Sequence, residues 1–327
     1  MDPLGRPEWS SNINQVIVLV SLAATAICMI IVYKEKTKYD SHAKCLLYFL
    51  ICSLLVTVIH VCVLNPVILL EHSIVFYNAP YEGSFRILDK FLQAIFLFCY
   101  NQTFLANLLC VVKMYTTVML MSDASTVQYA LNGITHLFRR NAVFGIALCF
   151  LYSTMFFIHK ITTQIKISEA ETEFLNTKSD HYDHDFLSFG TYVFAFILLV
   201  GFGIYIHLLL SYLKAMRHVL SKRKVFMSQK QWKHYSAAVE SLMAQSTFLF
   251  LLCIPLIFLI LAKLPVSLVS QAAVWYLEML FLSHPIVTSF SLIFTSSIYR
   301  SVVCCNKKRN QVQPFNSGNS QTQQDKF

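Results

Sequence analysis

The chain has 327 residues, of which 56% are hydrophobic and only 13% are charged. A typical soluble domain has about 25% charged residues, so this composition excludes an ordinary soluble domain. Phenylalanine (27) and tyrosine (16) are abundant, as suits side chains that face lipid or the membrane interface.

Seven segments run for 18 residues or more without Asp, Glu, Lys or Arg, apart from one glutamate in the last: residues 9–33, 45–70, 91–112, 141–159, 186–213, 241–262 and 265–299. About 20 apolar residues of helix cross a bilayer core about 30 Å thick. A helix also satisfies its own backbone hydrogen bonds in lipid. We therefore predict an all-α membrane protein, a seven-transmembrane helix bundle.

Three parts are expected: a short extracellular N-terminus (1–11), the transmembrane domain (12–303) and a cytoplasmic tail (304–327) rich in Gln, Asn and Ser, which we expect to be disordered. The seven segments use most of the chain, so no separate folded domain is expected. No cleavable signal peptide is expected either, because the first segment is long enough to span and lacks a small-residue cleavage site.

Lysine and arginine predict the orientation, since they concentrate on the cytoplasmic side of membrane proteins. They are most frequent in the connections 34–44 and 214–235 and after residue 299, which share one side of a seven-helix bundle. The N-terminus is therefore expected outside and the C-terminus in the cytoplasm. The net charge of +9 then reflects sidedness, and no nucleic-acid partner is expected.

The connections show where the chain bends. Asn65-Pro66 lies late in the second segment, and proline lacks a backbone N–H, so a kink or an early helix end is predicted there. The connection after the fourth segment is acidic and the longest external one; His181 and His184 in it could bind a divalent ion weakly, but a solvated loop is the better interpretation. Pro255 provides either a pivot in the sixth helix or a static kink.

Polar residues inside the segments are the candidates for ligand binding. Gln93, Tyr100 and Asn107 recur every seven residues and share one helix face. For Gln93 and Tyr100, in the outer half, ligand contact and interhelical hydrogen bonding remain open; for Asn107 the structural role is favoured. Glu278 is the only acid inside the segments, about 10 Å from Gln271 at 1.5 Å per residue. Both are candidate ligand contacts, with a structural role for Glu278 as the alternative.

Three further features concern the deeper half of the bundle and its inner end. His284-Pro285 should kink the seventh helix, and for His284 an interhelical bond is favoured over the alternative of a ligand contact. Lys113 lies at the inner interface, where it either snorkels or acts in a switch. Cys304 and Cys305 follow the last segment beside basic residues, a pattern that favours palmitoylation and contact with anionic membrane lipid; two unmodified thiols are the alternative.

Enzyme chemistry is not expected, because the chain contains no nucleophile elbow, phosphate-binding loop or zinc-ligand pair. We predict no catalytic residues, no resident metal and no cofactor.

Several motifs resemble a known family. The residues at the entry to the sixth helix are similar to those of nematode serpentine chemoreceptors of the Str superfamily, closest to its Sri and Srh groups: Met227-Ser228, Trp232, His234, 238–242 and Gln245. Pro255, Ser283-His284-Pro285 and Ile298-Tyr299-Arg300 fit as well, and the proline segments after the second helix fit more loosely. Strong similarity covers the last third of the chain. The acid-Arg-Tyr and Asn-Pro-x-x-Tyr motifs of rhodopsin-like receptors are not found.

The resemblance implies a G-protein-coupled chemosensory receptor in the plasma membrane, on a sensory cilium, that binds a small external molecule and signals to a heterotrimeric G protein. The residues then expected to face the G protein are Lys113, Arg217, Lys222, Arg223, Lys224 and Arg300. The alternative functions are a ligand-gated channel and a small-molecule transporter.

Overall fold

The computed structural model describes residues 8–35, 40–64, 67–69, 74–78, 86–119, 135, 142–162, 182–186, 189–225, 227–253, 271–295 and 300.

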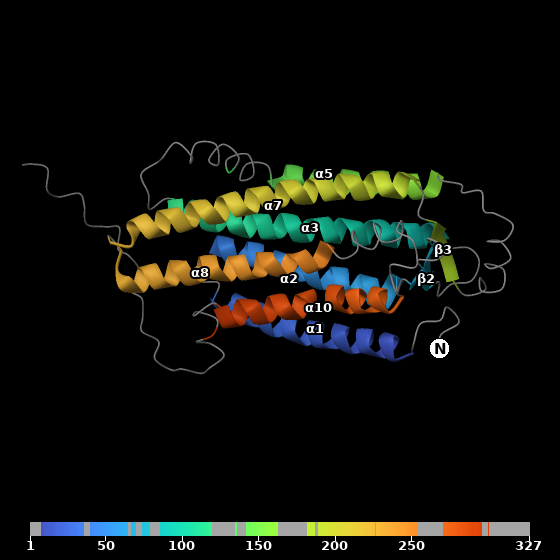
Figure 1. Cartoon of the computed structure of the whole chain (residues 1–327), viewed down its shortest axis with the longest axis horizontal. Coiled ribbons are helices and arrows are strands. Elements are labelled where there is room, and N and C mark those ends of the chain that lie inside the picture. The colour runs from blue at the N-terminus through green and yellow to red at the C-terminus, as the bar shows by residue number, and fades with distance from the viewer. Residues whose placement is uncertain are drawn as a thin grey trace, which may run out of the picture.

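The structure describes seven long helices, which run side by side along the length of the molecule (Figure 1). They are α1 (Glu8–Glu35), α2 (Asp40–Val58), α3 (Arg86–Met119), α5 (Ala142–Thr162), α7 (Phe189–Arg223), α8 (Gln229–Phe248) and α10 (Gln271–Thr295). Each contributes to a span that is long and apolar enough to cross a membrane. The predicted seven-helix bundle is therefore confirmed.

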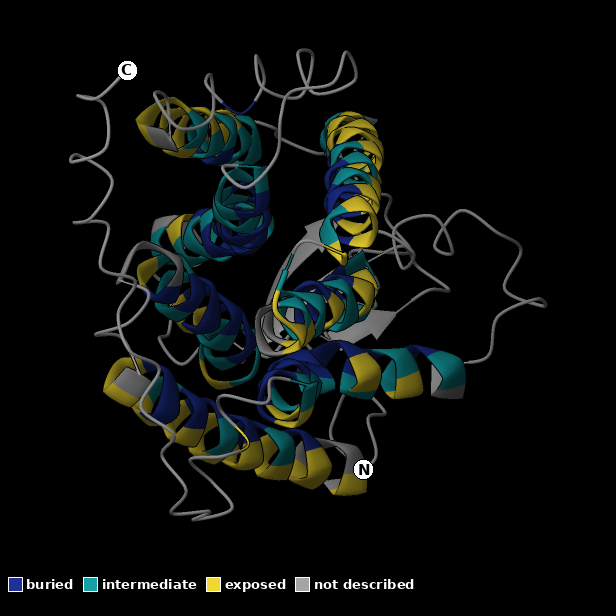
Figure 2. Ribbon diagram, turned by 90° about the vertical axis from the view of Figure 1, so that its left-hand side faces the viewer, coloured by how far each residue is buried: buried dark blue, intermediate teal, exposed yellow. Residues whose placement is uncertain are grey.

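Helix α3 lies at the centre of the bundle and contacts α2, α5, α7 and α8. In its most apolar window 56% of the residues are buried, against 6% for α5 and 11% for α7. The outer faces of α5 and α7 are apolar, with Phe150 and Phe196 each 65% exposed. Hydrocarbon tails are as apolar as these side chains, so lipid is the natural neighbour of the exposed faces (Figure 2).

Two helices change geometry at their ends. Helix α2 continues as a π-helical turn, η2 (Ile59–Leu64), and α8 continues as a 3₁₀ turn, η4 (Leu249–Cys253). Each turn lies just before a proline, Pro66 or Pro255, and a proline cannot donate the hydrogen bond that would continue the helix. Both prolines lie outside the described residues, so the pivot at Pro255 stays a prediction.

A small antiparallel sheet adds to the helical bundle. Its strands are β1 (Val67–Leu69), β2 (Ile74–Asn78) and β3 (Tyr182–Phe186), in the order β1-β2-β3. The register places Ile74 opposite Phe186 and Asn78 opposite Tyr182. Strands β2 and β3 join the connection between α2 and α3 to the connection between α5 and α7.

The sheet corrects one sequence-based boundary. The apolar segment 186–213 predicts that the fifth helix begins at Phe186, but Phe186 ends β3 and the helix begins at Phe189. Backbone pairing with β2 outweighs the apolar character of a single residue. Hydropathy cannot detect such a pairing, because it depends on segments far apart in the chain.

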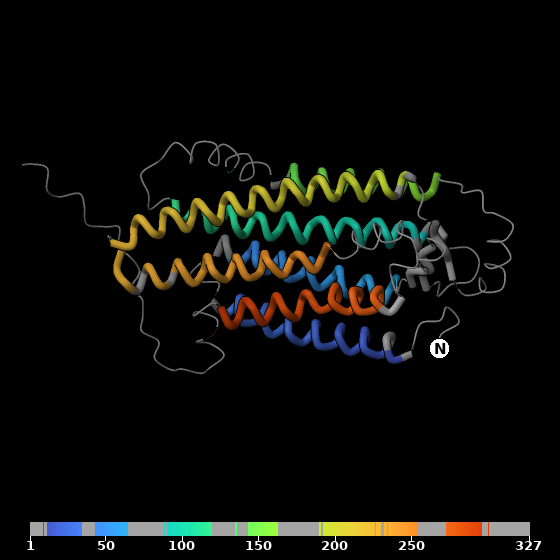
Figure 3. The backbone as a smooth tube through the Cα atoms, viewed as in Figure 1, coloured from blue at the N-terminus to red at the C-terminus, as the bar shows by residue number. Residues whose placement is uncertain are grey.

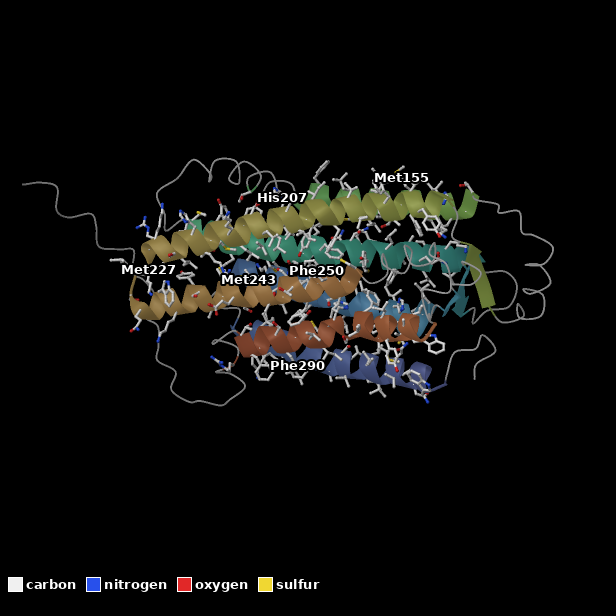
Figure 4. The ribbon with its side chains drawn as sticks, in the orientation of Figure 1. Met155, His207, Met227, Met243, Phe250 and Phe290 are labelled. Carbon is white, nitrogen blue, oxygen red and sulfur yellow. The ribbon has the colours of Figure 1, made fainter. Side chains whose placement is uncertain are left out.

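The opposite end of the bundle is formed by a helical hairpin (Figure 3). Helix α7 has 35 residues, about 52 Å at 1.5 Å per residue, and so it extends beyond a hydrocarbon core of about 30 Å. The turn is closed by hydrogen bonds from Met227 N to Arg223 O and from Trp232 N to Ser228 O, each 3.0 Å. Ser228 occupies the N-cap of α8, a position that serine favours, and Met227 lies at the tip (Figure 4).

Candidate functional site

The candidate site is a polar pair set among aromatic rings between α2, α3 and α10. Glu278 of α10 is 8% exposed, and its Oε1 lies 3.5 Å from Nε2 of His60, in the π-helical turn η2. The His60 ring packs against Phe96 and Phe281, with ring centroids 5.7 and 5.1 Å apart. Glu278, a candidate from sequence, thus faces the interior, and an ionisable group on a neighbouring helix is its partner.

Tyr100 connects this cluster to the sixth helix. Its ring stacks on Phe96 at 6.2 Å, and it is 4% exposed. Its hydroxyl donates a hydrogen bond of 2.5 Å to the backbone carbonyl of Leu252 in η4. The sequence leaves ligand contact and interhelical hydrogen bonding open for Tyr100, and the structure shows an interhelical hydrogen bond.

The chemistry of proline explains why this carbonyl accepts a side-chain donor. In a 3₁₀ helix, the carbonyl of one residue accepts from the N–H three residues later. The residue three places after Leu252 is Pro255, which has no N–H. An unpaired carbonyl in a nonpolar interior costs about 1–3 kcal/mol, and the Tyr100 hydroxyl supplies the missing donor.

Gln93 lies on α3 one turn before Phe96. It is 4% exposed, and neither its Nε2 nor its Oε1 has a hydrogen-bond partner among the described residues. Because buried amides are nearly always hydrogen-bonded, an amide with both ends unpaired is unusual. Gln93 is the sequence candidate whose geometry leaves the most capacity for a further partner.

A chain of aromatic contacts extends from Tyr100 toward α7 and η4. Tyr100 packs against Phe104 at 5.2 Å, and Phe104 packs against Phe202 of α7 at 5.6 Å. Phe202 in turn meets Phe250 of η4 at 5.8 Å; Phe250 is labelled in Figure 4. Protein interiors are close-packed, so a displacement of the Tyr100 ring would also displace the aromatic side chains packed beyond it, which belong to both helices of the hairpin.

Asn107 joins three helices one turn deeper. Its Oδ1 accepts hydrogen bonds from the hydroxyls of Tyr205 on α7, at 2.8 Å, and Ser246 on α8, at 3.3 Å. Asn107 is completely buried. The structural role favoured by the sequence is confirmed.

His284 forms the expected interhelical bond. Its Nε2 lies 2.8 Å from the hydroxyl of Ser53 on α2, and its Nδ1 lies 2.9 Å from the carbonyl of Phe281. Because a carbonyl can only accept, Nδ1 carries the proton and Nε2 accepts from Ser53. Both nitrogens are occupied, which removes His284 from the candidate ligand contacts. The helix continues through Pro285 to Thr295.

The C-terminal end of α3 packs against α7 through two tyrosines. Tyr115 and Tyr212 are fully buried, with ring centroids 5.0 Å apart, and Thr135 lies 3.2 Å from the Tyr212 hydroxyl. Lys113, two residues before Tyr115, is half-buried. The segment that carries an acid-Arg-Tyr motif in rhodopsin-like receptors is therefore a packed tyrosine contact in this chain.

Four predicted basic residues lie together in the last turns of α7 and the hairpin that follows. Arg217, Lys222 and Lys224 are exposed and Arg223 is half-buried. The ammonium of Lys224 lies 4.9 Å from the centre of the Trp232 ring, a cation–π distance. The structure thus gathers these residues on one exposed end of the molecule.

Comparison with known proteins identifies the family. A family model described as serpentine type 7TM GPCR chemoreceptor Sri matches residues 3–303. The chain belongs to this family. A search of curated individual proteins finds no match. Sri membership explains the seven spans and makes this a multi-pass membrane protein of a chemosensory, not an enzymatic, family. For the family in general it implies chemical ligands and G proteins as partners.

Some predicted residues of the Sri chain cannot be placed in the site. Gln271 is the first residue of α10, but its side chain, like Cys304 and Cys305, lies outside the described residues. Arg300 is exposed. His181 is also undescribed, and among the described residues no three His, Cys, Asp or Glu side chains gather to hold a metal ion.

Sequence reasoning missed His60, Phe96 and Phe281 in this Sri chain. One signal was available for His60: it is an ionisable residue inside an apolar segment, just before a proline, and intramembrane ionisable groups usually serve function. The aromatic residues carried no signal, because phenylalanine is common throughout the spans.

Proposed function

We propose that this Sri-family chain is a G-protein-coupled chemosensory receptor that binds a small external molecule in the outer half of the bundle. The observation that carries the proposal is the hydrogen bond from Tyr100 to Leu252. It joins a helix of the polar cluster to the helix that continues into the basic hairpin. Binding at one end and signalling at the other need such a connection.

The ligand is proposed to contact Gln93, Tyr100, Gln271 and Glu278, with His60 added from the structure. Support comes from the amide of Gln93, which has no hydrogen-bond partner among the described residues, and from the burial of Glu278. A ligand that forms hydrogen bonds with buried polar groups avoids the cost of leaving those groups unpaired.

Signal transmission is proposed to run through the sixth helix. A ligand shifts an equilibrium between two arrangements only by its differential affinity for them. A molecule that displaces the Phe96 and Tyr100 rings weakens the bond to Leu252 and frees η4 to change angle near Pro255. The inner ends of α7 and α8 then separate from the bundle.

The G protein is proposed to bind the inner end, at Lys113, Arg217, Lys222, Arg223, Lys224 and Arg300. Exposed basic side chains in a projecting hairpin favour an acidic partner surface. We further propose that the protein resides in the plasma membrane, on a sensory cilium, with its N-terminus outside, and that Cys304 and Cys305 are palmitoylated.

The direct test is ligand-dependent nucleotide exchange on a heterotrimeric G protein reconstituted with the purified receptor. The double variant Lys222→Gln/Lys224→Gln should reduce nucleotide exchange. The control Lys34→Gln removes an exposed charge from the last turn of α1, at the same end of the bundle as the hairpin, and should not reduce exchange. A receptor that reaches the cell surface and gives no exchange across a broad panel of odorants and G proteins contradicts the proposal. Ligand-evoked current in cells that lack G-protein signalling supports a channel in its place.

A further inference from the structure

The contact between His60 and Glu278 is longer than a charge-assisted hydrogen bond. A charge-assisted hydrogen bond between nitrogen and carboxylate has a length of about 2.7–2.9 Å, but these atoms are 3.5 Å apart. Nε2 of His60 has no hydrogen-bond partner among the described residues. The imidazole therefore stands beside the carboxylate without the geometry of a strong bond, and a better cation can displace it.

The surroundings of the pair favour a positive charge. Glu278 is the only acidic residue within the seven apolar segments, and a carboxylate in a nonpolar interior attracts a cation. The ring centroids of Phe96 and Phe281 lie 6.5 Å apart in an edge-to-face arrangement, and both rings contact the ring of His60. Aromatic faces attract ammonium groups. An anionic ligand would instead be repelled by Glu278.

The rest of the cluster indicates the shape of the cation. Aromatic rings of α3 and α10 dominate it, which suits an apolar ligand body. Gln93 lies about 4.5 Å along α3 from Phe96, at 1.5 Å per residue, and neither end of its buried amide has a hydrogen-bond partner in the part of the chain that the structure describes. A second polar group on the ligand can therefore either donate to or accept from Gln93.

We propose that the ligand of this site is a small amine with an apolar body. Its ammonium replaces His60 as the partner of Glu278 and contacts the rings of Phe96 and Phe281, while any further polar group meets Gln93. The inference rests on the proposed function in one respect, that this cluster is the ligand site. It adds the chemical class of the ligand.

The test is binding to the purified receptor in lipid nanodiscs, measured as a shift in melting temperature without any G protein. The probes are primary amines with linear, cyclic and aromatic bodies of about four to ten carbons. Each amine is compared with the alcohol and the carboxylate of the same skeleton, for example 2-phenylethylamine, 2-phenylethanol and phenylacetate. Amines are expected to stabilise the receptor, and their alcohol and carboxylate counterparts are not.

Two substitutions locate the binding. Glu278→Gln keeps the shape and removes the charge, and it should weaken amine binding about tenfold to a hundredfold, the range for a hydrogen bond to a charged group. Glu278→Asp should retain part of the affinity. The matched control is Glu240→Gln, which neutralises an exposed carboxylate at the inner end of α8 and should leave binding unchanged. The melting temperature of each variant without ligand checks folding.

The outcomes separate this inference from the proposed function. If no amine stabilises the receptor, or if amines bind equally well to Glu278→Gln, the ligand class is wrong. If alcohols or carboxylates bind and stimulate nucleotide exchange, the ligand class fails and the receptor function stands. If amines bind through Glu278 and no G protein responds, the ligand class stands and the signalling function fails.

Discussion

Replacing Tyr100 with phenylalanine tests whether α3 restrains the sixth helix. The change keeps the ring that packs against Phe96 and Phe104 and removes the hydroxyl that donates 2.5 Å to the Leu252 carbonyl. A buried hydrogen bond contributes about 1 kcal/mol net. If the bond is present only in the resting arrangement, its loss shifts the equilibrium toward the active arrangement about fivefold. A receptor that is active about 1% of the time would then be active about 5% of the time.

The assay is basal nucleotide exchange on a reconstituted G protein, with equal amounts of folded receptor and no ligand. Tyr152→Phe is the matched control, because the Tyr152 hydroxyl also donates to a backbone carbonyl, that of Phe194 at 2.7 Å, but joins α5 to α7. Tyr100→Phe should raise basal exchange about fivefold, and Tyr152→Phe should leave it unchanged. An unchanged rate in Tyr100→Phe, or an equal rise in both variants, would refute the restraint.

Two further predictions concern stability, each measured as the melting temperature of the purified receptor. Ser53→Ala should lower the melting temperature, because the buried Nε2 of His284 loses its donor at a cost of about 1–3 kcal/mol. The control Ser283→Ala removes a hydrogen bond within α10 and should have a much smaller effect. Equal losses in the two variants would contradict the assigned tautomer of His284. Gly190→Ala should also lower the melting temperature, because the new Cβ would overlap the ring of His159 in α5 and displace that ring from its contact with Phe194. Gly201→Ala, with nothing within 4 Å, should keep or raise it through better helix propensity, and a loss at both positions would refute the steric argument.

The architecture could be predicted from the sequence because lipid imposes a simple rule. Each span must be a long, uncharged helix, and the absence of charge over segments such as 9–33 and 91–112 is visible without any structure. The positions of the helix ends were harder to predict from the sequence. The uncharged segment 186–213, for example, begins at Phe186, but the structure places Phe186 in β3 and begins the helix at Phe189.

The candidate site could be predicted in part. Glu278 could be predicted because an ionisable side chain within a membrane span is rare and usually serves a function. Gln93 and Tyr100 could be predicted because their spacing places both on one face of α3. Their partners could not be predicted. His60 reaches Glu278 only because α2 and α10 lie together in the bundle, and the acceptor of Tyr100 is a backbone carbonyl that has no sequence signal of its own. The pairing of β2 with β3 depends likewise on contacts between distant segments.

Sidedness is the claim on which the outer ligand site and the inner signalling hairpin both depend. One tag is placed at the N-terminus and a second is inserted in the turn beside Ser228 in the hairpin, and antibody access is measured in intact and permeabilised cells. The account predicts that the N-terminal tag is reached in intact cells and that the hairpin tag is reached only after permeabilisation. Antibody access to the hairpin tag in intact cells would place the basic residues outside and contradict the account.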